Sequence, residues 1–121
     1  SHIIGTSTDG EIYEGDVKVN SIVIVFSYFN DVTIKSTLVK KETTDLLLGK
    51  KVAQNLKTNN SKVFIVFSDG LHTNGENFIK GIESIIDVTI AGGMAGDNGE
   101  FRETFVFNDK EVITNGAVGV S

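Results

Sequence analysis

The chain contains no cysteine, no proline and no tryptophan. The absence of cysteine excludes disulfide bonds and metal sites built from thiolates, and it suits a reducing compartment. The absence of proline means that every turn has to be formed by Gly, Asn, Asp or Ser. Pairs of such residues occur along the chain, for example Asn59-Asn60, Asp69-Gly70 and Asn115-Gly116. We therefore expect a cytoplasmic protein with polar turns.

Positive charge is also scarce, and long apolar runs are missing. The 11 Lys and Arg residues are outnumbered by 16 Asp and Glu residues, so the formal net charge is −5. This balance argues against a nucleic-acid partner, which needs a basic surface. No apolar run approaches the roughly 20 residues of a membrane span, so no membrane association is expected. With 121 residues, of which 40% are hydrophobic, we expect a single domain over residues 1–121.

The pattern of apolar residues predicts a mixed α/β fold, largely β, with two helices packed on a mixed sheet. The first helix is expected from a cap at Thr43 or Thr44 to Asn59, with a close packing contact at Gly49. The apolar face of the second helix runs from Phe78 to Ile86. Ahead of both helices, the runs 21–29 and 32–39 predict a hairpin of two strands, with 21–29 buried on both faces. Other expected strands are 3–5, 62–68, 88–91, 103–107, 111–113 and 116–120.

Four glycines follow a short β-branched run within the segment 88–99. Glycine loses more backbone entropy on folding than any other residue, so four of them in one loop need a structural reason. A weaker copy at 3–11 repeats the order of apolar strand, glycine, small residues, aspartate, and glycine beside an acid. The two copies indicate internally duplicated units of strand, Gly-rich loop and hairpin. They also predict a pocket formed by both loops.

Four motifs of this sequence resemble the N-terminal FIST domain in their order and spacing. They are Ile3 to Ile12, Phe67-Ser68-Asp69-Gly70, Ala91 to Asp97, and Asn115 to Val120, which together span essentially the whole chain. The resemblance implies a ligand-sensing input domain of prokaryotic signal-transduction proteins, coupled to an output signalling domain. It also implies a small-molecule ligand, for which amino acids are candidates, and haem is a candidate in some members.

The chain departs from the family in two respects. The family usually has cysteine where Thr6 stands, so no property that depends on a thiol transfers to this protein. Family domains also begin with a strand and a helix that are not found here, and we expect the chain to be part of a larger domain. The sheet edge left exposed by their absence favours a homodimer.

The two Gly-rich loops supply the candidate ligand-binding residues. Hydroxyl and backbone N–H groups would bind the carboxylate of an amino-acid-like ligand, and the acids would bind its ammonium group. Phosphate is disfavoured because neither a Gly-Lys-Ser/Thr sequence nor a helix follows the second loop. A tight turn required by sheet packing, and a turn that binds its own backbone, are the alternative explanations. The candidates are Ser7, Thr8, Asp9, Gly93, Ala95, Gly96 and Asp97.

Asp69 and His72 lead to two further hypotheses. With Asp97 and a divalent metal they would form a hydrolase site, but metal sites need three or four ligands and no nucleophile-elbow motif is present. In a haem sensor, His72 would be the axial nitrogen ligand and Met94 the only sulfur. An exposed loop without a ligand is the simpler interpretation. We therefore expect no catalytic residue, no metal and no cofactor.

Overall fold

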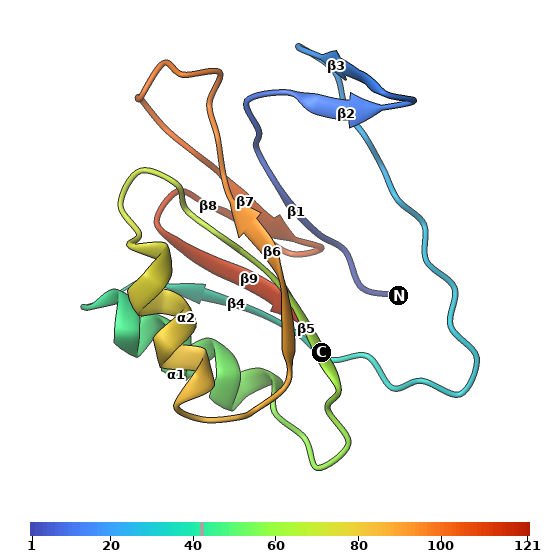
Figure 1. Ribbon diagram of the computed structural model, residues 1–121, viewed down its shortest axis with the longest axis vertical. Coiled ribbons are helices and arrows are strands. Elements are labelled where there is room, and N and C mark those ends of the chain that lie inside the picture. Colours follow the sequence, from blue (N-terminus) through green and yellow to red (C-terminus); the bar gives the residue numbers. More distant parts are fainter. Residues whose placement is uncertain (42) are drawn as a thin grey trace.

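Four strands form the central sheet, in the order β4 (Ser36–Lys40), β9 (Gly116–Val120), β5 (Val63–Ser68) and β6 (Thr89–Met94). The computed structural model describes residues 1–41 and 43–121 (Figure 1). Strand β9 is antiparallel to both of its neighbours, whereas β5 and β6 are parallel. The central sheet is therefore mixed, as the sequence predicted.

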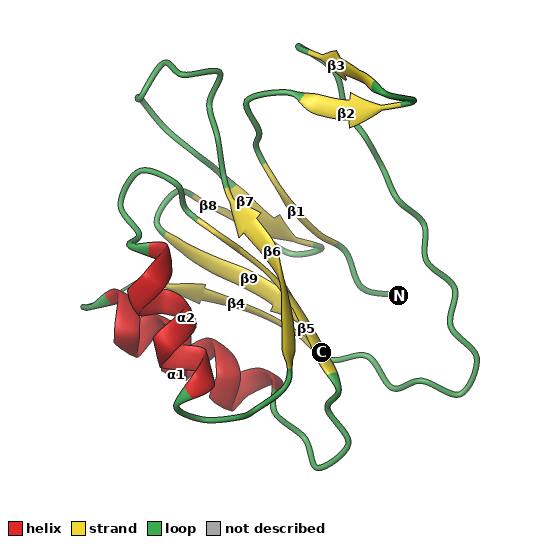
Figure 2. Ribbon diagram, in the orientation of Figure 1, coloured by secondary structure: helices red, strands yellow, loops and turns green. Residues whose placement is uncertain are grey.

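Both helices lie on one face of the central sheet (Figure 2). Helix α1 (Asp45–Leu56) precedes β5, and helix α2 (Gly75–Glu83) connects β5 to the parallel strand β6. The side chains of Thr44 and Asn74 cap the two helices by accepting hydrogen bonds from N–H groups of the first turns. The main core lies between helices and sheet, and its fully buried members include Val52, Leu56, Phe64, Ile82 and Ala117. Two helices on a mixed sheet confirm the predicted fold class.

A small second sheet covers part of the opposite face. It has the order β1 (Ile4–Thr6), β7 (Val106–Asn108) and β8 (Val112–Ile113), with antiparallel pairs throughout. Its buried side chains pack on the central sheet in a second core of Ala95, Val106, Ile113 and Val118. A separate hairpin of β2 (Glu11–Tyr13) and β3 (Asp16–Lys18) extends from this layer (Figure 1).

The two helices meet at a pair of glycines. A Cβ atom on Gly49 would overlap the carbonyl oxygen of Phe78, and one on Gly81 would overlap the carbonyl oxygen of Leu46. The close packing contact predicted at Gly49 is therefore confirmed, with Gly81 as its counterpart on α2. Absence of side chains at both positions lets the two backbones approach each other directly.

The predicted hairpin of residues 21–29 and 32–39 is wrong. Residues 21–35 form no strand, and β4 begins only at Ser36, where it pairs with β9. All residues from 21 to 29 are exposed, including Phe26, which we expected in the core and which is 92% exposed. The apolar run specifies a strand covered on both faces, but no described strand pairs with it.

Several element boundaries also differ from the prediction. Helix α1 ends at Leu56 rather than at Asn59, and β6 continues through the first two glycines of the Gly-rich segment to Met94. The hairpin β2–β3 was not predicted; Glu14 and Gly15 form its turn, both with positive φ. Strand β7 begins at Val106 instead of Glu103, because the backbone N–H groups of residues 101–103 bind a carboxylate instead of a strand.

We expect Gly81→Ala to destabilise the protein by about 1–3 kcal/mol, because an added methyl group overpacks the contact between α1 and α2. Helix propensity alone would give the opposite sign, a gain of about 1 kcal/mol. Urea unfolding followed by circular dichroism measures the difference. Gln54→Ala, at an exposed position of α1, is the control and should change stability little. Stabilisation by Gly81→Ala would contradict the contact.

Candidate functional site

The two Gly-rich loops lie against each other and form a two-loop junction, which we define as residues 7–10 and 95–99. The N–H group of Gly96 donates to the carbonyl oxygen of Ser7 at 3.0 Å. The N–H groups of Asp97 and Gly99 donate to Asp9 Oδ1, at 2.9 and 3.3 Å. The fold thus brings together two segments that are about ninety residues apart in the sequence.

Close approach explains one of the glycines in this junction. A Cβ atom on Gly96 would lie 2.5 Å from Asp9 Oδ1 and 2.7 Å from the backbone nitrogen of Asp9. Any side chain at this position would push the two loops apart. Gly96 is thus required by contact between the loops themselves, in line with a role in packing.

The remaining candidates of the first loop bind neighbouring protein groups. The hydroxyl oxygen of Ser7 accepts a hydrogen bond from the N–H group of Phe105 at 2.9 Å. The Thr8 hydroxyl donates to Glu11 Oε1 at 2.6 Å. Hydrogen bonds from Ser21 and Thr8 hold the pKa of the Glu11 carboxyl below its usual value. In contrast, Asp9 Oδ2 accepts no hydrogen bond from the described residues.

Asp97 organises the chain that follows the second loop. Its carboxylate accepts hydrogen bonds from the N–H groups of Arg102 at 2.7 Å, Phe101 at 3.1 Å and Glu103 at 3.2 Å. These backbone hydrogen bonds, with that of Arg102 the strongest influence, lower the pKa of Asp97. Its carboxylate therefore fixes residues 97–103 as one closed loop.

An apolar groove begins where the two-loop junction ends. It has a volume of about 250 Å³ and lies at the carboxyl ends of β5 and β6, beside the first turn of α2. Of the predicted site residues, Gly93 lines this groove. Ala95 lies next to it, and its N–H group donates a hydrogen bond to the carbonyl oxygen of Ser68, with 2.8 Å between nitrogen and oxygen. The lining residues are Val66, Ser68, Gly75, Phe78, Ile79 and Ile90 to Met94.

Ser68 is the polar side chain of this groove. It is 2% exposed and is the one residue of the lining with a hydroxyl group. Ser68 was not among the ligand-binding residues predicted from the sequence. The signal was available: a strand, a helix and a second parallel strand form a βαβ unit, and ligands of such units bind at the carboxyl ends of the strands.

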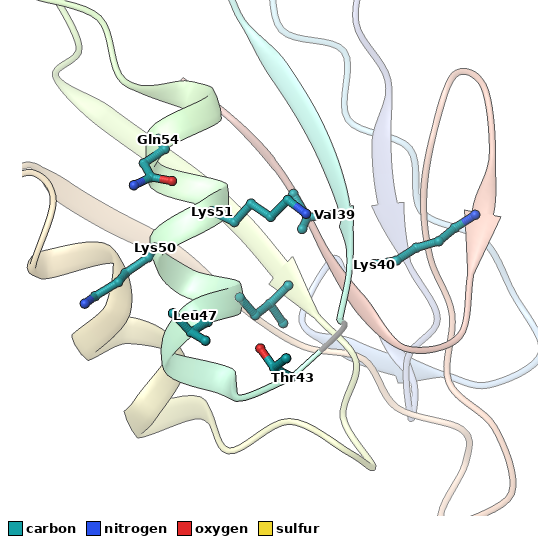
Figure 3. Close-up of a pocket in the computed structure, with 8 residues that line it drawn as sticks. Val39, Lys40, Thr43, Leu47, Lys50, Lys51 and Gln54 are labelled. Atoms are coloured by element: carbon teal, nitrogen blue, oxygen red, sulfur yellow. The ribbon is translucent and has the colours of Figure 1, made fainter.

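A second hollow, of about 440 Å³, lies between β4 and α1 (Figure 3). Lysines 40, 50 and 51 line it, but Figure 3 shows Lys40 and Lys50 pointing away from each other. Lys40 is also paired with Glu111, with 3.0 Å between Nζ and Oε2. The lysines therefore do not converge on one anion, and none of the predicted site residues lies here.

The Asp69 carboxylate binds its own loop. It is fully buried and accepts hydrogen bonds from the N–H groups of His72, at 2.7 Å, and Leu71, at 3.3 Å, and from the Thr104 hydroxyl. His72 Nδ1 lies 3.2 Å from Asp69 Oδ2, while the His72 side chain is 58% exposed. Across residues 1–41 and 43–121, no group of three or more potential ligands is placed to hold a metal ion.

The family model of the FIST N domain matches residues 1–121. The chain belongs to the FIST N domain family. This match confirms the resemblance seen in the four sequence motifs. FIST domains are sensory domains of signal-transduction proteins. No curated protein and no solved structure matches the chain. None of the described helices of this FIST N domain is long and apolar enough to cross a membrane.

We expect Asp97→Asn to lower the melting temperature of this FIST N domain at neutral pH, because a neutral amide replaces the acceptor of three N–H groups. The pKa of Asp97 is lowered in the folded state, so its stabilising effect is present above the unfolded pKa of about 4. That effect is lost as the pH falls through the lower folded pKa. The melting temperatures of wild type and variant should therefore converge in acid.

Thermal unfolding followed between pH 7 and pH 2 measures this convergence. Asp109→Asn is the matched control, because the Asp109 side chain is exposed and accepts no hydrogen bond from the described residues. A constant difference between wild type and Asp97→Asn at every pH would show that the charge of Asp97 has no part in holding its loop.

Proposed function

We propose that this FIST N domain is a non-enzymatic input module that binds a small amino-acid-like molecule at the groove between β6 and α2. The two-loop junction then transmits the binding to an output signalling domain. The observation that carries the proposal is the position of Ser68, a buried residue whose hydroxyl group belongs to the lining of an otherwise apolar groove. A buried polar group of this kind is stabilised when a ligand supplies its hydrogen bond.

The lining of the groove favours a ligand with a carboxylate and an apolar side chain. Gly75 is the first residue of α2 and lines the groove, so the positive end of the helix dipole lies there and favours an anionic group. Val66, Phe78 and Ile79 provide apolar contact. The ammonium group would point toward the acids of the two-loop junction. Among these, Asp9 Oδ2 accepts no hydrogen bond from the described residues.

The groove and the two-loop junction are connected by three consecutive residues. Met94 lines the groove, Ala95 is bonded through its N–H group to Ser68, and Gly96 is bonded through its N–H group to Ser7. A ligand that displaces Met94 would therefore change the contact between the loops. In this mechanism the predicted residues Ser7, Thr8, Asp9, Gly96 and Asp97 respond to the ligand, and Gly93 contacts it.

We expect one or more amino acids with apolar side chains to raise the melting temperature of the domain. Each amino acid is tested beside its amide and its deaminated acid, which separates the contributions of carboxylate and ammonium. Ser68→Ala should raise the dissociation constant of the ligand about 10-fold, because one hydrogen bond to a charged group is lost. Thr33→Ala, at an exposed threonine outside the groove, is the control and should leave the constant unchanged. Absence of stabilisation by every compound would refute the proposed ligand.

We expect His72→Ala to leave the ligand-induced melting shift unchanged. Two contacts that hold the loop of His72 are made by its backbone and remain in the variant, since its N–H group donates to Asp69 and its carbonyl oxygen accepts from Lys41; only the contact of Nδ1 with Asp69 is lost. The imidazole itself is largely exposed. Addition of hemin to both proteins is the companion measurement. A Soret band that is present in the wild type and lost in His72→Ala would replace this proposal with a haem sensor.

A further inference from the structure

The segment 21–29 carries a large apolar surface, most of which is exposed. Ile22 is 85% exposed, Phe26 92% and Tyr28 90%. The segment contains no charged residue, and its Ile, Val, Phe and Tyr side chains have high β propensity. Continuous exposed apolar surface of this kind marks an interaction site.

The segment has the composition of a strand without a partner. Even-numbered positions 22 to 28 place two Ile, one Phe and one Tyr on one side of an extended chain, and odd-numbered positions 23, 25 and 29 place Val, Val and Phe on the other. Both sides are therefore apolar. Such a strand needs a sheet edge that offers cover on its two faces.

The edge formed by β4 does not suit this segment. Lys40 belongs to β4, Lys35 and Lys41 flank it, and the hollow beside it is lined by Lys50 and Lys51. Lysines along an edge oppose the addition of a strand, because pairing would desolvate their ammonium groups.

The edge formed by β6 does suit it. Neither β6 nor the groove beside it contains a charged residue, and the groove faces the side of the sheet that carries α2. On the other side of the sheet, Val63 and Ile65 of the neighbouring strand are 44% and 40% exposed. A strand added to β6 would thus meet apolar side chains on both faces.

Residues 30–35 connect the segment 21–29 to β4, and their length limits whether the segment can pair with β6 of its own chain. Lys35 is held to Ser121 by two backbone hydrogen bonds of 3.1 and 2.8 Å, beside β4 and β9. A strand added to β6 lies four strand spacings from β4, about 19 Å. The six steps from Phe29 to Lys35 span at most about 21 Å when fully extended. Asp31 has a φ of 57°, which bends this link and shortens its reach.

We propose that two copies of this chain exchange their 21–29 segments, each segment pairing with the free edge of β6 in the other copy. The exchange is reciprocal, so it closes into a two-fold symmetric dimer and buries both apolar segments. Each added strand lies in the plane of the sheet, about 4.8 Å beyond β6, and needs no ligand to form its hydrogen bonds. The dimer therefore does not depend on the proposed ligand.

Sedimentation velocity without any ligand is the first test, and we expect a concentration-dependent equilibrium of monomer and dimer. Ile24→Lys should raise the dimer dissociation constant roughly 100-fold or more, because it places a charge within the paired strand. Val17→Lys, at a site of β3 that is 69% exposed, is the control and should leave the constant unchanged. A protein that is monomeric at all concentrations, or that forms unlimited aggregates, would overturn the proposal.

Cross-linking identifies the edge that is used, since the natural chain has no cysteine. A size-tagged Val25→Cys protein is mixed with an untagged Ala91→Cys protein and oxidised. We expect a mixed disulfide of intermediate size, in excess over the same mixture made with Lys40→Cys on β4. A double variant with cysteines at 25 and 91 that instead forms its disulfide within one chain would refute exchange between copies. Equal cross-linking to position 40 would refute the β6 edge.

Discussion

The fold around the candidate site depends on hydrogen bonds from backbone N–H groups to two carboxylates. Asp9 receives the second Gly-rich loop, and Asp97 closes that loop onto residues 101–103. Without these acceptors, several loop N–H groups would have no partner in the chain. The small sheet is connected to the central sheet through this junction, so its position depends on two charged side chains as well as on apolar packing.

The two halves of the Gly-rich segment lie in different surroundings. Gly92 and Gly93 belong to β6 and lie at the groove, whereas Gly96 and Gly99 belong to the loop and contact Asp9 or its hydrogen-bonding network. In the proposed function, one half contacts the ligand and the other responds to it. A FIST N domain could in this way couple an apolar binding groove to a polar switch within a few residues.

Local patterns in the sequence predicted the elements whose partners are close in the chain. The strand at 63–68, the cap of α1 at Thr44 and the close contact at Gly49 follow from periodicity, a capping residue and a glycine within a helix. Long-range effects were not predictable in the same way. The apolar run 21–29 indicates a strand but does not specify which edge receives it, and the later start of β7 follows from hydrogen bonds to Asp97. The groove around Ser68 required the spatial arrangement of β5, α2 and β6.

The lysines along β4 have a consequence for the size of any assembly. A sheet with two accepting edges can add strands from both sides and grow into a fibre. Here one edge carries Lys40 and is flanked by Lys35 and Lys41, and the uncharged edge is β6. In the proposed dimer each copy has used both its 21–29 segment and its β6 edge, so no unpaired apolar segment remains to recruit a third copy. Reciprocal exchange, together with the lysines at the β4 edge, would thus make an aggregation-prone segment compatible with a finite particle.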